Sequence, residues 1–165
     1  MNNEQYKRLS KIQSGLDNYI GESKGIDMKD YKLERIIALQ VEFNELLQEL
    51  PFLFKYWSNK EMNKEKALEE FVDGIHFLLS IGNDLNITDY EYDRPEAHDM
   101  KKIVFGIQNA ISILPEMNVP KPMYNVLMHH YLLFGEKLGF TTDQIIDAYM
   151  SKNEVNYARQ ESGVY

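Results

Sequence analysis

The chain has 165 residues, 44% of them hydrophobic, and its 26 aspartates and glutamates exceed its 18 lysines and arginines, giving a formal net charge of −8. This length and apolar content predict one globular domain over residues 1–165 rather than a disordered chain, and the absence of cysteine excludes disulfides, thiolate metal sites and cysteine nucleophiles. The acidic balance disfavours nucleic acid as a partner, and the lack of a secretory signal and of a run of roughly 18 apolar residues predicts a cytoplasmic protein without a membrane partner.

The pattern of apolar residues is helical along the chain, because it follows the 3–4 spacing of amphipathic helices and lacks the strict alternation of strands. We expect an all-α, single-domain helical bundle of about five to six helices, near residues 4–20, 30–50, 63–86, 96–114, 121–138 and 142–160. Gly21 and Gly25 separate the first two helices, and Pro51 ends the second or begins a short segment that contains Trp57. The polar, proline-containing stretch 86–99 is predicted to be a loop.

Two segments in the second half of the chain, 103–114 and 123–134, are almost entirely apolar. Helices of this kind are buried inside a bundle or at a subunit interface, and the sequence leaves both alternatives open. After them, Thr141 and Gln144 have the spacing of a capping box, which predicts the start of the last helix at this point.

Two pairs of acidic residues occur at helical spacing beside the residues expected to form the core. Glu42 and Glu45 are three residues apart in the second helix, and Glu70 and Asp73 are three apart in the third, which is mostly apolar. Neither pair alone is specific, because acidic residues at this spacing are common on exposed faces or in ion pairs. Two such pairs on neighbouring helices, however, can bring four carboxylates to one point.

A cluster of four carboxylates needs a positive charge among them. No lysine or arginine occurs in segments 38–50 or 68–85. A hard cation with oxygen ligands, Mg²⁺ above all, is the natural answer, whereas zinc would require cysteines or better-spaced histidines.

Further residues could complete a site for a charged ligand. Lys152, Asn156 and Arg159 share one face of the last helix and suit phosphate oxygens, although such a stripe is also typical of a solvated surface. His76 could reach a phosphate or could be a hydrogen-bonded core histidine. Gly74, inside a buried helix, indicates the close approach of another helix or of a ligand.

Five short motifs resemble those of the dimeric, all-α dUTPase family, and they occur in the order found in that family. They are KIQSGLD (11–17), EFNE (42–45), FKYW (54–57), EEFVDGIHFLLSIG (69–82) and KNEVNYARQESGVY (152–165). The resemblance implies membership of the wider group of all-α NTP pyrophosphohydrolases, which also contains MazG-type enzymes and phage dCTPase-dUTPases.

Carried over residue by residue, the resemblance implies that two or more Mg²⁺ ions bind at Glu42, Glu45, Glu70 and Asp73. It also implies substrate contacts: Gln13 and Asp17 toward the uracil and deoxyribose, Trp57 and His76 in the nucleotide site, and Lys152, Asn153, Asn156, Arg159 and Tyr165 in a segment closing over the sugar and phosphates. Two positions depart from the family pattern. Gly163-Val164-Tyr165 stands in place of Gly-Tyr, and Asp17 replaces an asparagine of some relatives.

The implied reaction is the hydrolysis of dUTP to dUMP and pyrophosphate by a homodimer, with dUTP or dUDP as the small-molecule substrate. Glu42 or Glu45 would act as general base toward water attacking the β-phosphorus, and Lys152 and Arg159 would stabilise the leaving phosphate. One alternative is a MazG-type or dCTP/dUTP-directed pyrophosphohydrolase with another base preference. A second alternative is a non-catalytic helical binding module.

Overall fold

The computed structural model describes residues 1–90 and 99–163, and every regular element within them is helical. In chain order these are α1 (Asn3–Lys24), the 3₁₀ turn η1 (Met28–Tyr31), α2 (Lys32–Gln48), α3 (Pro51–Phe54), α4 (Lys64–Asp84), α5 (Met100–Ile113), the 3₁₀ turn η2 (Leu114–Glu116), α6 (Pro120–Lys137) and α7 (Thr142–Ser162). The all-α prediction is confirmed. The described residues form seven α-helices rather than five to six, because a four-residue helix follows Pro51 in addition to the six long ones.

Several predicted boundaries shift for identifiable reasons. The first helix continues through Gly21 to Lys24, and the break falls at Gly25, whose φ of 66° is the left-handed conformation that ends helices. The capping box predicted for the last helix is present, with Thr141 accepting from the backbone of Gln144 and Gln144 reaching back. Residues 91–98, which include most of the predicted loop 86–99 and the start of the predicted helix 96–114, lie outside the described residues.

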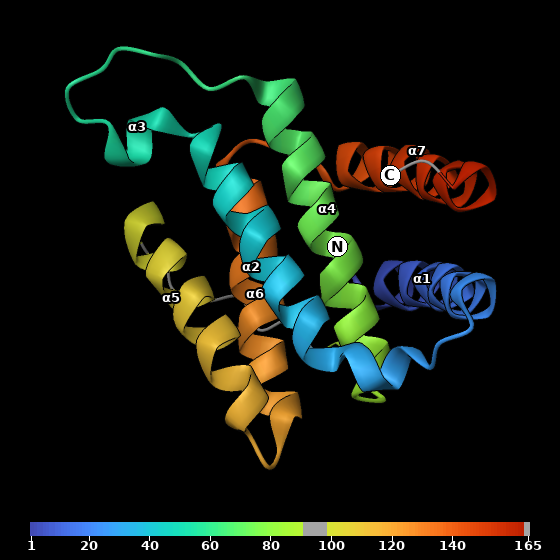
Figure 1. Cartoon of the computed structure of the whole chain (residues 1–165). Coiled ribbons are helices and arrows are strands. Elements are labelled where there is room, and N and C mark those ends of the chain that lie inside the picture. The colour runs from blue at the N-terminus through green and yellow to red at the C-terminus, as the bar shows by residue number, and fades with distance from the viewer. Residues whose placement is uncertain (91–98, 164–165) are drawn as a thin grey trace.

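Helix α4 lies at the centre of the arrangement, where it contacts α1, α2, α6 and α7. Figure 1 shows α1 and α7 side by side on one side of α4, and α2, α6 and α5 on the other. Because α4 has neighbours on several sides, its residues Phe71, Ile75, Leu78 and Leu79 are fully buried. Among the described residues, no helix combines the length and apolarity needed to cross a membrane.

The two apolar segments of the second half have different surroundings. The segment of α6 belongs to the core, where Tyr124, Tyr131 and Phe134 have no exposed surface. Helix α5 packs on α6 by one face only, and its Phe105 is 70% exposed. The close approach that Gly74 predicts is made by α6, since the Tyr131 hydroxyl occupies the space above this glycine and donates to the carbonyl of Phe71 at 3.1 Å.

Candidate functional site

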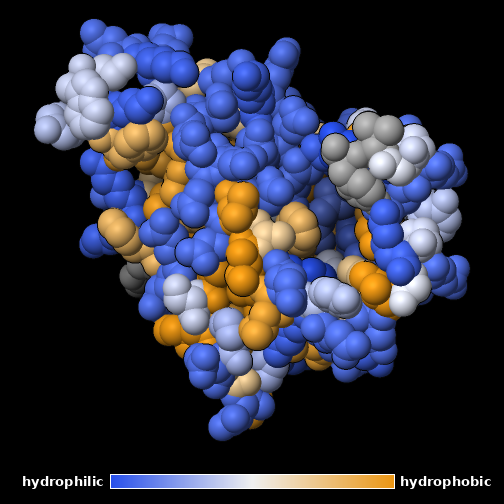
Figure 2. All heavy atoms as spheres, in the orientation of Figure 1, coloured by the Kyte–Doolittle hydropathy of each residue, from blue (hydrophilic) through white to orange (hydrophobic). Residues whose placement is uncertain are grey.

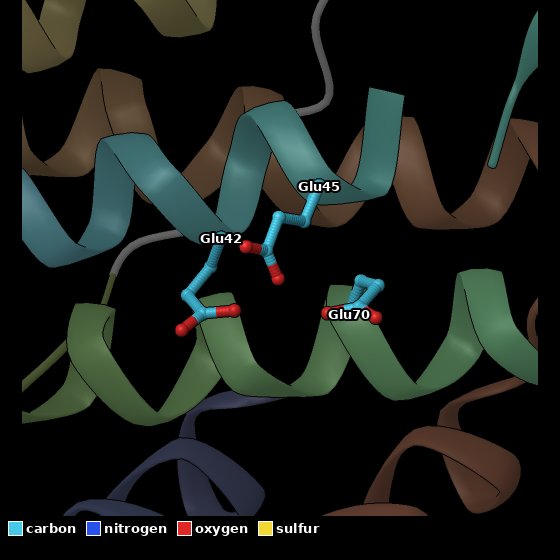
Figure 3. A group of neighbouring side chains, drawn as sticks. All are labelled: Glu42, Glu45 and Glu70. Carbon is cyan, nitrogen blue, oxygen red and sulfur yellow. The ribbon is translucent and has the colours of Figure 1, made fainter. Parts of the chain in front are cut away.

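Three of the four predicted carboxylates come together where α2 and α4 pack against each other. One carboxylate oxygen from each of Glu42, Glu45 and Glu70 lies within 4.8 Å of the others, and Figure 3 shows these side chains facing each other between the two helices. Glu42 and Glu70 are half-buried, whereas Glu45 is exposed. The i, i+3 spacing of Glu42 and Glu45 places both on the side of α2 that faces α4.

The fourth carboxylate, Asp73, lies one helical turn beyond Glu70 and has a cation as its partner. The Nζ of Lys152, from α7, lies 2.6 Å from Oδ2 of Asp73 and 3.3 Å from Oε1 of Glu69. The segments of α2 and α4 that contain these carboxylates have no lysine or arginine. Part of the compensating positive charge therefore comes from Lys152 on the last helix. Lys152 reaches Asp73 but leaves the other three carboxylates without an ion pair to it.

The electrostatics of the carboxylates indicate a deficit of positive charge. Burial, and then the charges of Asp73, Glu45 and Glu70, raise the pKa of Glu42 to about 7. Burial and neighbouring acids also raise the pKa of Glu70, and burial raises that of Asp73 against the opposing contact with Lys152. An all-oxygen donor set with unbalanced negative charge fits a hard divalent cation, so Glu42, Glu45 and Glu70 could hold one.

The same charges predict a pH-dependent stability for the metal-free protein. Between its ordinary pKa of 4.5 and its folded-state pKa of about 7, Glu42 releases its proton more readily in the unfolded chain. Raising the pH through this window therefore stabilises the unfolded state relative to the folded one. The Tm in EDTA should fall by several degrees between pH 5 and pH 8. Thermal melts followed by circular dichroism measure this, and Mg²⁺ should restore Tm at pH 8. A Glu42→Gln variant should show a flatter dependence, and an equal fall in this variant would contradict the assignment.

A cavity of about 260 Å³ opens beside the carboxylates, between α1, α2, α4 and α7. Its wall contains residues of both charges and several apolar side chains: Gln13, Leu16, Asp17, Ile20, Met28, Arg35, Glu42, Asp73, His76, Phe77, Ser80, Lys152, Asn156, Arg159 and Gln160. Two of the four predicted carboxylates, Glu42 and Asp73, thus line the cavity. A ligand in this cavity could contact cations of α7 and a metal held by the carboxylates at the same time.

The cavity brings together most of the residues predicted to contact a substrate. Gln13, Asp17, His76, Lys152, Asn156 and Arg159 all line it.

Three further predicted contacts are placed differently. Asn153 is buried on α7 but is not part of the cavity wall. Trp57 follows α3, is 69% exposed and packs edge-on against Tyr56, away from the wall. Tyr165 lies outside the described residues.

The structure adds residues that the sequence did not single out. Arg35 is buried in the cavity wall, where it donates to the carbonyl of Met28 at 2.9 Å and pairs with Asp84 at 3.2 Å. It also donates to the hydroxyl of Ser80 at 3.0 Å. Its position seven residues before Glu42, on the same face of α2, was the available signal. Arg35 and its three partners, Met28, Ser80 and Asp84, also line a second cavity of about 470 Å³ between α1, η1 and the end of α4.

The sequence was compared with models of known protein families and with curated proteins. A family model described as dUTPase matches residues 5–164, nearly the whole chain. A comparison with curated proteins found no match.

Proposed function

Because the chain belongs to the all-α dUTPase family, we propose that it hydrolyses dUTP to dUMP and pyrophosphate in the cavity between α1, α2, α4 and α7. The single observation that carries this location is that Glu42 and Asp73, from the acidic region, and Lys152 and Arg159, from α7, line one cavity. A triphosphate needs both a metal site and cationic side chains, and this cavity offers the two together.

The family indicates a dependence on divalent metal, and we propose Mg²⁺ at Glu42, Glu45, Glu70 and Asp73, with two or more ions. The ion, when bound, neutralises charge on the phosphate oxygens and makes water more acidic. Oδ2 of Asp73 contacts Lys152, and we propose that Asp73 gives up this contact when it joins the metal ligands. That exchange would free the Lys152 ammonium to bind the phosphates of the substrate.

Within the proposed site, Glu42 is the better candidate for the general base. It lines the cavity and is half-buried, whereas Glu45 is exposed and lies outside the cavity wall. Glu42 would take the proton of the attacking water, and Lys152, Asn156 and Arg159 would hold the phosphate oxygens. Gln13, Asp17 and His76, on α1 and α4, would contact the nucleoside.

A substrate panel tests the proposed function and its two alternatives. We expect the protein with Mg²⁺ to release pyrophosphate from dUTP, with little turnover of dCTP, dTTP, UTP or dATP. A broad panel or a preference for dCTP would favour a MazG-type or dCTP/dUTP-directed enzyme. The absence of turnover for every nucleotide would favour a non-catalytic binding module and would overturn the proposal.

We further propose that the protein is a homodimer and that its second copy covers an apolar face formed by α2, α3 and α5. Leu33, Ile37 and Val41 recur every four residues on the exposed side of α2. Figure 2 shows hydrophobic side chains reaching the surface of this face. The same face contains a shallow cavity of about 410 Å³ lined mainly by apolar residues, including Phe54 and Phe105. An apolar area of this kind is typical of an interface between subunits.

Light scattering after size exclusion tests this face. We expect the wild type to have twice the 19.4 kDa mass of one chain. Ile37→Lys should shift it toward 19.4 kDa, because a lysine at the centre of an apolar interface loses its hydration. Val119→Lys, which changes an equally exposed residue before α6, should leave the mass unchanged. A monomeric wild type would exclude the dimer.

A further inference from the structure

A buried chain of hydrogen bonds runs along the wall of the cavity and has the amide of Gln13 at its centre. The Nε2 of Gln13 donates to Oδ1 of Asp17 at 2.8 Å. Its Oε1 lies 2.8 Å from the hydroxyl of Tyr149, which donates to it, and 2.8 Å from Nδ1 of His76. All four residues are buried, so water does not compete for these bonds.

The orientation of this amide decides the protonation of the histidine. A reversed amide would place a carbonyl oxygen 2.8 Å from the carboxylate of Asp17, and two acceptors repel each other. The Tyr149 hydroxyl has one proton, and its other acceptor, the carbonyl of Leu9, lies 3.5 Å away, so the shorter contact to Gln13 takes it. Both partners thus hold Oε1 toward His76. Because Oε1 only accepts, Nδ1 of His76 must carry the proton.

The remaining nitrogen of His76 is then an acceptor without a donor. Nε2 is buried and has no hydrogen-bond partner among the described residues. Burial, and then the charge of Lys152, lower the pKa of His76 to about 3, against a smaller opposing influence of the Tyr149 backbone, so the ring is neutral. The ring also stacks on that of Tyr149, with centroids 4.1 Å apart, and His76 lines the cavity. A buried acceptor with no partner among the described residues can take a hydrogen bond from water or from a ligand in the cavity that His76 lines.

We propose that Tyr149 is a positioning residue that, through the carbonyl of Gln13, holds His76 in its Nδ1–H form, so that Nε2 accepts a hydrogen bond from the nucleoside of the substrate. This inference rests on the proposed dUTP hydrolysis and names a residue that the family motifs do not include. The donor is an N–H or O–H group of the nucleoside, either the imide N3–H of uracil or a sugar hydroxyl. Cytosine has no proton at N3, so an imide contact would also favour uracil over cytosine.

The first test reads the tautomer of His76 in the free protein by ¹H–¹⁵N NMR, with a His76→Asn sample to identify its signals. We expect Nδ1–H in the wild type and a measurable fraction of Nε2–H in Tyr149→Phe, which keeps the stacked ring and removes one of the two contacts that orient the Gln13 amide, while the contact with Asp17 remains. Tyr157→Phe is the matched control, because it makes the same change on the same helix at a residue outside the cavity wall. Nε2–H in the wild type, or no change in Tyr149→Phe, would overturn the inference and leave the proposed function intact.

The second test compares substrates. Tyr149→Phe should raise KM for dUTP about tenfold and change kcat much less, as expected for a weakened hydrogen bond to the substrate. If N3–H is the donor, N3-methyl-dUTP should show no difference between wild type and variant. If the 3′-hydroxyl is the donor, 2′,3′-dideoxyuridine triphosphate should show none. A penalty that persists with both analogues contradicts the role of Nε2, whereas a wild type that turns over no dUTP contradicts the proposed function itself.

Discussion

Replacing Glu45 by glutamine is expected to lower kcat/KM for dUTP by about 10³-fold or more, although the side chain is exposed. A glutamine keeps the size of the side chain but removes one of the three charges that meet within 4.8 Å between α2 and α4. The loss should therefore follow from weaker metal binding, and higher Mg²⁺ concentrations should recover part of the activity. Initial rates of pyrophosphate release at several Mg²⁺ concentrations measure both effects.

The control for this variant is Glu49→Gln, one helical turn further along the chain at the end of α2. Glu49 lies outside the group of carboxylates, so its replacement should change kcat/KM by less than about twofold. Both variants should retain the helical circular dichroism spectrum of the wild type. Full activity of Glu45→Gln, or equal losses in the two variants, would remove the support for a metal site at these carboxylates.

Replacing Gly74 by alanine is expected to lower the free energy of unfolding by about 2 kcal/mol. A Cβ at this position would lie 2.6 Å from Cζ of Tyr131 and closer still to its hydroxyl. Tyr131 cannot move away cheaply, because it is fully buried, bonded to the carbonyl of Phe71 and stacked on the Phe71 ring. This crowding outweighs the gain of roughly 1 kcal/mol that alanine brings to a helix interior. Urea unfolding followed by circular dichroism measures the change.

Gly15→Ala provides the opposite expectation within the same fold. Gly15 is exposed on α1, and an added Cβ would make only an ordinary contact of 3.4 Å with the hydroxyl of Tyr157. This variant should therefore be more stable by up to about 1 kcal/mol. A stabilised Gly74→Ala variant would contradict the close contact between Tyr131 of α6 and Gly74 of α4.

The sequence predicts those parts of the molecule that depend on position along one helix. The i, i+3 spacings place Glu42 with Glu45, and Glu70 with Asp73, on shared faces, and the apolar pattern of α4 requires neighbours around it. The pairing of Asp73 with Lys152 depends instead on the position of α7 against α4, which no local pattern encodes. The structure groups Glu42, Glu45 and Glu70 within 4.8 Å and places Asp73 beside Lys152, and the metal-binding role of these four carboxylates stays a prediction.

Side chains that act through tertiary contacts were the hardest to predict. Tyr149 has the sequence neighbourhood of an ordinary core residue, and only the crossing of α1, α4 and α7 brings its hydroxyl to Gln13. Arg35 gave a weak signal, as a charge on the buried face of α2. Trp57 was assigned from a motif alone, and its exposed position after α3 leaves its role in the nucleotide site a prediction.

The most direct measurement is a crystal structure with Mn²⁺ in place of Mg²⁺ and with the non-hydrolysable analogue α,β-imido-dUTP. We predict anomalous peaks within about 2.5 Å of carboxylate oxygens of Glu42, Glu45 and Glu70, with the triphosphate between them and Lys152. The contact between Lys152 and Asp73 should open as Asp73 joins the metal ligands. Peaks away from these carboxylates, or a nucleotide bound outside the cavity between α1, α2, α4 and α7, would contradict the proposed site.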